Sequence, residues 1–310
     1  MKTVSVILPN YNHSKYLTQR IRSIINQTYS DFELIILDDC STDSSRSIIE
    51  GYKNHPKIKK TIYNKKNSGS TFKQWHKGIE LAKGEYIWIA ESDDYCDNTF
   101  LEEMVKCLDQ NPNTGFAYCR SHQVDSEGKI IIRRSNETSI LVHNGIEFIK
   151  NQLVFKNSIY NASMAIFRKA QYKKILHSNY QKFKYCGDWY FWILLAEISD
   201  VIELKTPLNY FRRHCNTVSI KSEENGLYII EGLEIYKYIN KYLSCFKKIE
   251  VLNYWSKLFV KSKFENHIKK QVFQKCFQKL NHRKLLYFLN LGYFNCKANL
   301  KKMLNLSKKE

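Results

Sequence analysis

Short apolar runs alternate with amphipathic stretches along the first 125 residues, and this alternation restricts the fold more than any other feature. Each run has the length of a buried strand and is followed by apolar residues at helical spacing. Such βα repeats build a mostly parallel sheet covered by helices, so we predict a doubly wound α/β half. The expected strands are 4–8, 33–37, 59–63, 85–90 and 115–118, and the expected helices are 16–25, one through 48–52, 72–81 and 100–108.

The remaining residues divide into a mixed region and a helical one. Residues 126–220 predict strands at 130–133, 162–167 and 201–204 and a helix that begins near Asp188, whereas residues 225–306 read as helices. Hydrophobic residues make up 43% of the 310, which is enough for a sizeable core. No apolar run approaches the roughly 20 residues of a membrane span, and the N-terminus lacks a signal peptide. We therefore expect a cytoplasmic protein.

Polar residues follow three of the predicted strands. They are Asn10-Tyr11-Asn12, Asp38-Asp39 and Glu91-Ser92-Asp93-Asp94. In open α/β sheets ligands bind outside the carboxyl ends of strands, so these segments should share one crevice. Carboxylate pairs there suit Mg²⁺ or Mn²⁺, although turn and helix capping is an equally ordinary use. Neither glycine-rich phosphate loop pattern occurs, which leaves a metal to neutralise a phosphate.

A series of motifs in a fixed order carries a family resemblance. They are Ser5 to Asn12, Gln27-Thr28-Tyr29, Phe32 to Asp43, Asn67-Ser68-Gly69, and Gly84 to Ile87 running into Asp93-Asp94. Together they resemble family 2 of the nucleotide-sugar glycosyltransferases, over roughly residues 3 to 220. The resemblance implies the GT-A fold and inversion of the anomeric configuration. It predicts a catalytic domain at 1–220 and a basic, aromatic-rich helical extension at 221–310.

The resemblance also implies a nucleotide site and a metal site. The residues that it implies for nucleotide binding are Pro9, Asn10, Tyr11, Asn12, Asp39, Asn67, Gly69 and Asp93. Asp39 would accept a hydrogen bond from the imide N–H of uracil or thymine, because an ionised carboxylate only accepts. Asp94 would ligate the cofactor, Mn²⁺ or Mg²⁺.

The resemblance places the chemistry of transfer farther along the chain. Asp188, in Cys186-Gly187-Asp188-Trp189, matches the catalytic base that takes the proton of the acceptor hydroxyl. The competing interpretation is that Asp188 caps a buried helix. Arg212 and His214 match a late loop that approaches the diphosphate, against the alternative of a solvated basic loop.

The sequence alone does not decide the roles of the tryptophans and the cysteines. Trp75, Trp189 and Trp192 form either an aromatic wall for a sugar acceptor or part of the core, and we expect Trp192 to be buried. The nine cysteines have no C-x-x-C pair and irregular spacing. We read them as reduced core residues.

The positive charge is concentrated in the C-terminal extension. Residues 241–310 hold 17 Lys and Arg against three acids, a net of +14, and residues 1–240 carry only +5. The lysines are interleaved with aromatic residues, a pattern that fits an anionic membrane surface. It fits equally well helices that pack on the catalytic domain or form a homodimer. Nucleic-acid binding is not expected, since no binding signature accompanies the charge.

These observations together predict a metal-dependent, inverting glycosyltransferase. It would transfer a single sugar from a nucleoside-diphosphate sugar, UDP-sugar favoured, to a glycan or lipid-linked glycan acceptor in bacterial surface polysaccharide synthesis. The absence of a Gln-x-x-Arg-Trp segment argues against processive synthesis. The rivals are a nucleotidyltransferase, which needs a glycine-rich basic loop where Pro9 to Asn12 stand, and a catalytically silent binding protein.

Overall fold

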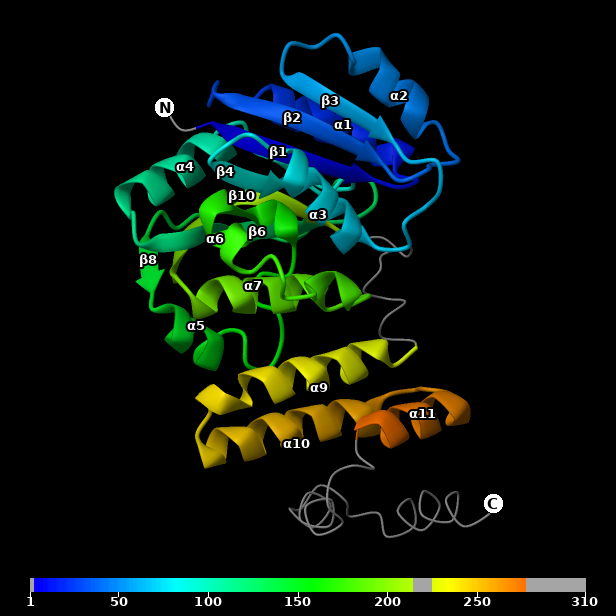
Figure 1. Cartoon of the computed structure of the whole chain (residues 1–310), viewed down its shortest axis with the longest axis vertical. Coiled ribbons are helices and arrows are strands. Elements are labelled where there is room, and N and C mark those ends of the chain that lie inside the picture. The colour runs from blue at the N-terminus through cyan, green and yellow to red at the C-terminus, as the bar shows by residue number, and fades with distance from the viewer. Residues whose placement is uncertain (1–2, 214–224, 277–310) are drawn as a thin grey trace. The chain divides into compact units, whose positions relative to one another are not determined.

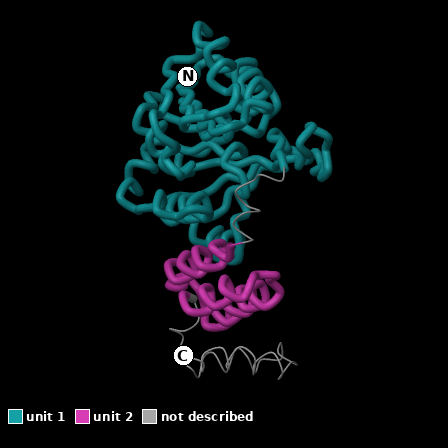
Figure 2. The backbone as a smooth tube through the Cα atoms, turned by 90° about the vertical axis from the view of Figure 1, so that its right-hand side faces the viewer, with its two compact units in different colours: residues 1–217 teal, residues 218–310 magenta. Residues whose placement is uncertain are grey.

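The computed structural model describes residues 3–213 and 225–276 of the chain (Figure 1). Contacts divide the chain into two compact units, residues 1–217 and 218–310, coloured separately in Figure 2. The first unit holds the sheet, and the described part of the second, residues 225–276, is helical. The predicted mixed α/β fold with C-terminal helices is confirmed.

The first unit is built on a ten-stranded mixed sheet. Its strands are β1 (Val4–Asn10), β2 (Phe32–Asp38), β3 (Ile58–Tyr63), β4 (Tyr86–Ile89), β5 (Tyr95–Cys96), β6 (Thr114–Val124), β7 (Ile130–Ile132), β8 (Ile140–His143), β9 (Ala165–Arg168) and β10 (Asp200–Arg212). The main order is β3-β2-β1-β4-β9-β6-β10-β5, with β7 on β6 and β8 on β10.

Helices cover the faces of this sheet (Figure 1). They are α1 (Ser14–Ile25), α2 (Ser45–Tyr52), α3 (Thr71–Leu81), α4 (Phe100–Gln110), α5 (Gly145–Asn151), α6 (Lys169–Lys174) and α7 (Gly187–Glu197), with the 3₁₀ turns η1 (Ala162–Met164) and η2 (Tyr180–Lys182). All residues of β1 and β2 are buried, as expected for parallel strands covered on both faces.

The parallel part of the sheet brings the strand ends together. β1 pairs with β2 in a register that sets Asn10 opposite Asp38, and it pairs with β4 on its other side. The segments that follow these strands therefore lie at one edge.

The predicted elements are found, and the main differences lie in the second half of the unit. β6 and β10 are much longer than expected, and the expected strand at 162–167 begins as the turn η1. The sequence did not indicate β5, which is only two residues long, or β8, which lacks a buried face. Both pair antiparallel with β10, so they depend on a distant partner rather than on local periodicity.

The second unit contains α9 (Leu227–Ile239), η3 (Asn240–Tyr242), α10 (Cys245–Lys261) and α11 (Asn266–Cys276). Trp255 is completely buried against Gly232, where an added Cβ would come within 2.1 Å of the indole. Ser244 caps α10 by accepting a hydrogen bond from the Lys247 N–H. This unit thus has a small core of its own.

Six cysteines whose surroundings are described are free thiols, and four of them are buried. Cys215, Cys296 and the side chain of Cys276 lie outside the described part of the structure. The expectation of a core position is wrong for Cys245, which is exposed. None of the helices within 3–213 and 225–276 has both the length and the apolar character that crossing a bilayer requires.

Candidate active site

The loops after β1 and β2 are tied to each other by hydrogen bonds. Asn10 is buried, and its Nδ2 donates to Asp38 Oδ2 at 2.8 Å and to Ser41 Oγ at 3.1 Å. Asn12 has a positive φ of 56°, and its backbone N–H donates to Ser41 Oγ at 2.9 Å. Tyr11 between them is 46% exposed. The predicted loop is therefore a fixed turn that presents one aromatic ring to solvent, while Pro9 stays buried within β1.

Asp39 is buried and surrounded by donors. Its carboxylate accepts from Asn64 Nδ2 at 2.6 Å, from Gln74 Nε2 at 3.0 Å, and from Ser68 through both the backbone N–H (3.0 Å) and Oγ (2.7 Å). These bonds fill the accepting capacity of a carboxylate. A base N–H that binds Asp39 must displace one of them.

The segment that contains Ser68 closes over Asp39. Asn67 Nδ2 donates to the Asp39 carbonyl at 3.0 Å, and Asn67 Oδ1 accepts from the Gly69 N–H at 2.8 Å. Gly69 has φ 72°, a conformation that side chains disfavour. The structure thus brings three predicted nucleotide contacts together.

The two carboxylates of the Asp93-Asp94 pair have different surroundings. Asp94 is completely buried and accepts from Asn161 Nδ2 (2.5 Å), Ser163 Oγ (2.7 Å) and the Arg212 N–H (3.0 Å). Burial, together with the neighbouring Asp93 charge, raises the pKa of Asp94 to about 7. Asp93 is only half-buried. Metal ligation by Asp94 stays a prediction, and Asp93 is the more accessible member of the pair.

The side chain of Arg212 forms its hydrogen bonds within the protein. It is 2% exposed, and its side chain donates to the Asp93 carbonyl (2.8 Å), to Gln19 Oε1 (2.7 Å) and to the Asp125 carbonyl (3.0 Å). Its guanidinium also lies 4.6 Å from the Tyr16 ring centre. The structure therefore argues against the predicted diphosphate contact and makes Arg212 a residue that positions Asp93. His214 lies outside the described residues.

Two further charged groups, absent from the predicted site, lie near the Asp pair. Glu91 accepts from Trp75 Nε1 at 2.8 Å, and burial next to Asp93 raises its pKa to about 8. Arg20 is completely buried with its guanidinium 4.7 Å from the Trp88 ring centre, and its charge lowers the pKa of Glu91 and of Asp94. An arginine is costly inside a core unless it offsets such acids.

The position of Arg20 in the sequence could have indicated its role. It stands between Leu17 and Ile24 on the apolar stripe of α1, and both of these neighbours are buried. A positive charge on such a stripe indicates a buried anion nearby.

Asp188 lies in the first turn of α7, which begins at Gly187 after the N-cap residue Cys186. It is not the N-cap residue, but its Oδ1 accepts from the Trp189 N–H at 2.7 Å, so its side chain satisfies one of the free first-turn donors of the helix. Its Oδ2 accepts from Asn157 Nδ2 at 2.9 Å, and the residue is half-buried. A negative charge is favourable at this end of a helix because of the helix dipole.

A short segment, residues 157–163, connects Asp188 to Asp94. Asn157 binds Asp188 at one end, and Asn161 and Ser163 bind Asp94 at the other. These donors were not predicted, since nothing in their local sequence indicates a partner 31 or 67 residues away.

The three tryptophans belong to the core. Trp75, Trp189 and Trp192 are 2%, 1% and 0% exposed. Trp189 Nε1 donates to the Leu153 carbonyl at 2.9 Å. Burial of Trp192 is confirmed, and the aromatic wall for an acceptor is wrong because none of these rings reaches the surface.

The described residues include no group of three or more His, Cys, Asp or Glu that would hold a metal by themselves. Mg²⁺ and Mn²⁺ in phosphate-binding sites commonly use one or two protein carboxylates and take the remaining ligands from phosphates and water. Half-buried Asp93, with its backbone fixed by Arg212, fits that role.

Comparison with known proteins identifies the family. The model of glycosyl transferase family 2 matches residues 5–176, which is more than half of the chain. The chain belongs to glycosyl transferase family 2. An uncharacterised glycosyltransferase of Haemophilus influenzae is 31% identical over 194 residues, which cover 60% of this chain and 72% of that protein.

Two similar proteins have solved structures with a bound nucleotide sugar. Staphylococcus aureus TarS, a poly(ribitol-phosphate) beta-N-acetylglucosaminyltransferase, is 34% identical over 113 residues, covering 36% of this chain and 20% of TarS. The structure of TarS 1-349 with UDP-GlcNAc has a TM-score of 0.57 at 19% identity and covers 94% of this chain and 79% of that chain. The mannosyltransferase PcManGT of Pyrobaculum calidifontis, with GDP-Man and Mn²⁺, has a TM-score of 0.56 at 15% identity and covers 99% and 81%. These structures support the fold.

Proposed function

We propose that this glycosyltransferase moves one sugar from a UDP-sugar to a hydroxyl of a bacterial cell-surface glycan, with inversion and with a divalent metal. The observation that carries the proposal is the connection of three carboxylate positions in one unit. Asp39 and Asp93 follow β2 and β4, the two strands that flank β1, and segment 157–163 links the Asp93-Asp94 pair to Asp188. This arrangement supports a nucleotide site at Asp39, a phosphate site at the Asp93-Asp94 pair and a base at Asp188.

The donor nucleotide would bind at the ends of β1 and β2. Asp39 accepts from the uracil N3–H after the Ser68 hydroxyl gives up its place, and Tyr11 supplies an exposed ring for the base. TarS, whose structure contains UDP-GlcNAc, supports a uridine donor. Asn67 and Gly69 shape the loop that closes on the ribose side.

The diphosphate would be held next to Asp93. A bound Mg²⁺ or Mn²⁺ supplies positive charge that stabilises the departing nucleoside diphosphate. Asp93 is the ligand we favour, and Asp94 holds the turn in place through Asn161, Ser163 and the Arg212 N–H. PcManGT, solved with Mn²⁺, supports metal use.

Asp188 would act as the base of the transfer. Its carboxylate accepts the proton of the acceptor hydroxyl while that oxygen bonds to the anomeric carbon and the bond to the nucleoside diphosphate breaks. Attack from the face opposite the leaving group inverts the configuration. Asn157 fixes Oδ2 of Asp188 and keeps the carboxylate oriented.

The second unit would bring the enzyme to an anionic membrane surface in the cytoplasm, where a lipid-linked acceptor is presented. Phe246 is 87% exposed at the start of α10. Lys241 lies nearby in sequence, with its Nζ 4.4 Å and 4.8 Å from the rings of Tyr238 and Tyr242. Exposed aromatic rings among lysines suit a headgroup region, where each cation adds about 1 kcal/mol. The predicted homodimer is the competing use of this surface.

A donor screen tests the activity. We would incubate the purified protein with Mn²⁺ and UDP-, dTDP- or GDP-sugars and measure release of the nucleoside diphosphate, with a chelator in a parallel sample. We expect release from a UDP-sugar that the chelator abolishes. Absence of release from every donor would instead indicate a silent sugar-binding protein.

Sedimentation with liposomes tests the membrane proposal. We expect binding to anionic vesicles at low salt, loss of binding at 1 M salt where the screening length is about 3 Å, and weaker binding by Phe246→Ser. Binding to neutral and anionic vesicles alike would contradict it. A dimer in gel filtration that Phe246→Ser dissociates would assign the surface to self-association.

A further inference from the structure

Two exposed arginines, Arg133 and Arg134, follow β7 directly. Neither takes part in any ion pair among the residues that the structure describes. In the turn between β6 and β7, Asp125 accepts from backbone N–H groups of its own turn and Glu127 binds Lys15. Asp97, whose charge acts on His122 as the charges of both arginines do, is half-buried. Both arginines are thus exposed, and neither guanidinium is neutralised by an ion pair within the described part of the chain.

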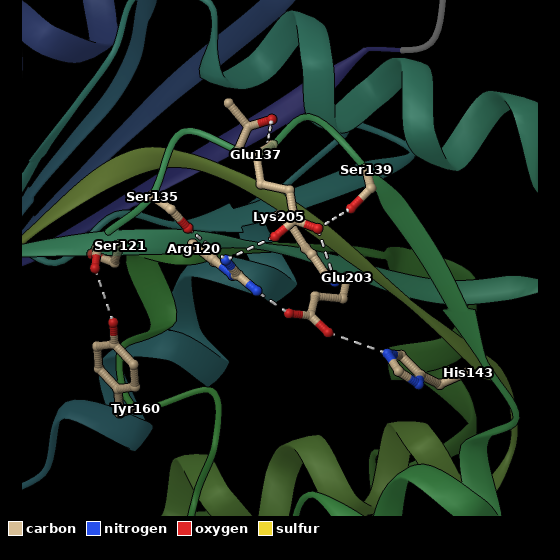
Figure 3. A network of polar contacts seen from close by, with 10 residues as sticks. Arg120, Ser121, Ser135, Glu137, Ser139, His143, Tyr160, Glu203 and Lys205 are labelled. Atoms are coloured by element: carbon tan, nitrogen blue, oxygen red, sulfur yellow. Dashed lines mark hydrogen bonds and ion pairs between the residues drawn. The ribbon is translucent and has the colours of Figure 1, made fainter. Parts of the chain in front are cut away.

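A network of polar contacts fixes the segment that carries these arginines (Figure 3). From β6, Arg120 Nη1 donates to Ser135 Oγ at 3.2 Å and to Glu137 Oε2 at 3.3 Å. From β10, Lys205 Nζ donates to Glu137 Oε1 at 3.0 Å. The Lys205 backbone N–H donates to the Ser139 carbonyl at 3.0 Å. Residues 135–139 are thus anchored on β6 and β10 from both sides.

The same network also pairs Glu203. Glu203 lies between Arg120 (Nε to Oε1, 3.8 Å) and His143 (Nε2 to Oε2, 3.3 Å), as Figure 3 shows. Glu137 and Glu203 are therefore both paired within the sheet face. Neither is free to neutralise Arg133 or Arg134.

Arg134 lies beside the segment that joins the two ends of the active site. Its backbone N–H donates to His122 Nδ1 at 3.0 Å, and its side chain interacts with the Tyr160 hydroxyl. Tyr160 also donates to the Ser121 carbonyl at 3.2 Å. It stands in segment 157–163, between the residue that binds Asp188 and those that bind Asp94.

We propose that Arg134, with Arg133 beside it, forms an acceptor subsite for an oxyanion, a phosphate or carboxylate group on the glycan that receives the sugar. This inference rests on the proposed function, since it takes Asp188 as the acceptor end of the site. A guanidinium presents a planar fork of N–H donors that matches the two oxygens of such a group. An anchored backbone lets Arg134 bind without ordering a loop, which lowers the entropic cost of binding.

The test uses oligomers of matched length as probes, because the natural acceptor is unknown. We would measure binding of a glycerol-phosphate oligomer, an oligogalacturonate and a neutral maltooligosaccharide by calorimetry at fixed ionic strength. The phosphate and carboxylate probes distinguish the two sources of the anion. Variants are Arg134→Gln, Arg134→Lys and, as a matched loss of one exposed arginine elsewhere, Arg46→Gln on α2.

We expect an anionic oligomer to bind and the neutral one not to bind. Arg134→Gln should weaken anion binding roughly tenfold, as for loss of a charge-assisted hydrogen bond, and Arg134→Lys by less. Arg46→Gln should stay within twofold of the wild type. Equal binding of neutral and anionic probes, or an equal loss in Arg46→Gln, would overturn the subsite, because the attraction would then be non-specific.

Release of UDP from a UDP-sugar without acceptor separates this inference from the proposed function. In Arg134→Gln the subsite requires a larger loss of anion binding than of UDP release, because the described contacts of Arg134 reach His122 and Tyr160. A wild-type protein that releases UDP but binds no anionic oligomer would refute the subsite alone. A protein that releases no UDP would refute the proposed function.

Discussion

The first unit has two halves that are assembled in different ways. In the donor half, residues 3–124, the site residues follow neighbouring parallel strands, so the register of β1 with β2 and β4 already brings them together. In the acceptor half, residues 125–213, the site residues are held by hydrogen bonds between positions far apart in the sequence. The Arg212 N–H, for example, donates to Asp94, 118 residues away. The proposed nucleotide site is thus a product of topology. The acceptor side depends on individual hydrogen bonds.

The largest effect is expected at Asp188, where a substitution should reduce sugar transfer without changing UDP binding. Asp188→Asn should reduce sugar transfer by roughly 10²- to 10⁴-fold, the usual range for loss of a general base, while UDP affinity stays the same. The amide still accepts from Asn157 through its oxygen. Single-turnover transfer and calorimetry would measure the two quantities, with Glu197→Gln at the other end of α7 as control. Wild-type transfer in Asp188→Asn would show that the base lies elsewhere.

The Asp93-Asp94 pair provides a contrast within the donor half. Asp93→Asn should weaken Mn²⁺-dependent UDP binding by roughly tenfold or more, because it removes the accessible charge next to the phosphates, with little change in stability. Asp94→Asn should lower the free energy of unfolding by about 1–3 kcal/mol, because an amide N–H₂ would face donors from Asn161, Ser163 and Arg212. Calorimetry and denaturant unfolding test both. Unchanged stability together with lost metal binding in Asp94→Asn would restore Asp94 as the ligand.

Stability should fall with rising pH because of the buried acids. The pKa values of Glu91 and Asp94 are raised to about 8 and about 7 in the folded protein. At a pH between the ordinary pKa of an acid and its raised pKa, the folded protein keeps a proton that the unfolded chain releases. Their contribution is full below about pH 4 and is lost as pH rises through 7 to 8. Glu91→Gln, which keeps the bond to Trp75, should reduce this decline by on the order of 1 kcal/mol.

Unfolding measured from pH 5 to pH 9 tests this expectation. Glu80→Gln, at an exposed position of α3, is the matched control and should leave the profile unchanged. A wild-type profile that rises over this range would contradict the assigned direction of the pKa shifts.

The smallest effect concerns the loop over Asp39. Ser68→Ala removes a donor that competes with the base for Oδ2, so UDP affinity should rise by roughly two- to fivefold, within the worth of one hydrogen bond. Ser70→Ala is the control, since the Ser70 hydroxyl has no hydrogen-bond partner among the described residues. Weaker UDP binding in Ser68→Ala would mean that this serine supports the bound loop instead.

The sequence predicted the donor half well because its signals are local. Apolar runs at 4–8 and 33–37 could only be buried strands, and the polar residues after them had to share an edge. Asp39 and the Asp93-Asp94 pair were found in this way.

The remaining site residues could not be predicted from the sequence, because their roles depend on contacts between distant parts of the chain. Nothing near Asn157, Asn161 or Ser163 in the sequence indicates that they bind Asp188 and Asp94. Arg212 looked like a phosphate ligand because a charged residue in a late loop is normally exposed, and its burial depends on Gln19 and Tyr16 from α1. The sequence placed Asp188 at the start of a helix, but its bond to the Trp189 N–H could be seen only in the structure.

The most direct test of the account is calorimetric comparison of UDP with CDP, each with Mn²⁺. Uracil carries an N3–H, which Asp39 accepts in our account, whereas the corresponding cytosine nitrogen is an acceptor and would face the carboxylate with no proton between them. We predict that UDP binds and that CDP binds at least tenfold more weakly, a difference that Asp39→Asn reduces. Equal affinity for the two nucleotides, or no binding of either, would contradict the assignment of the donor site.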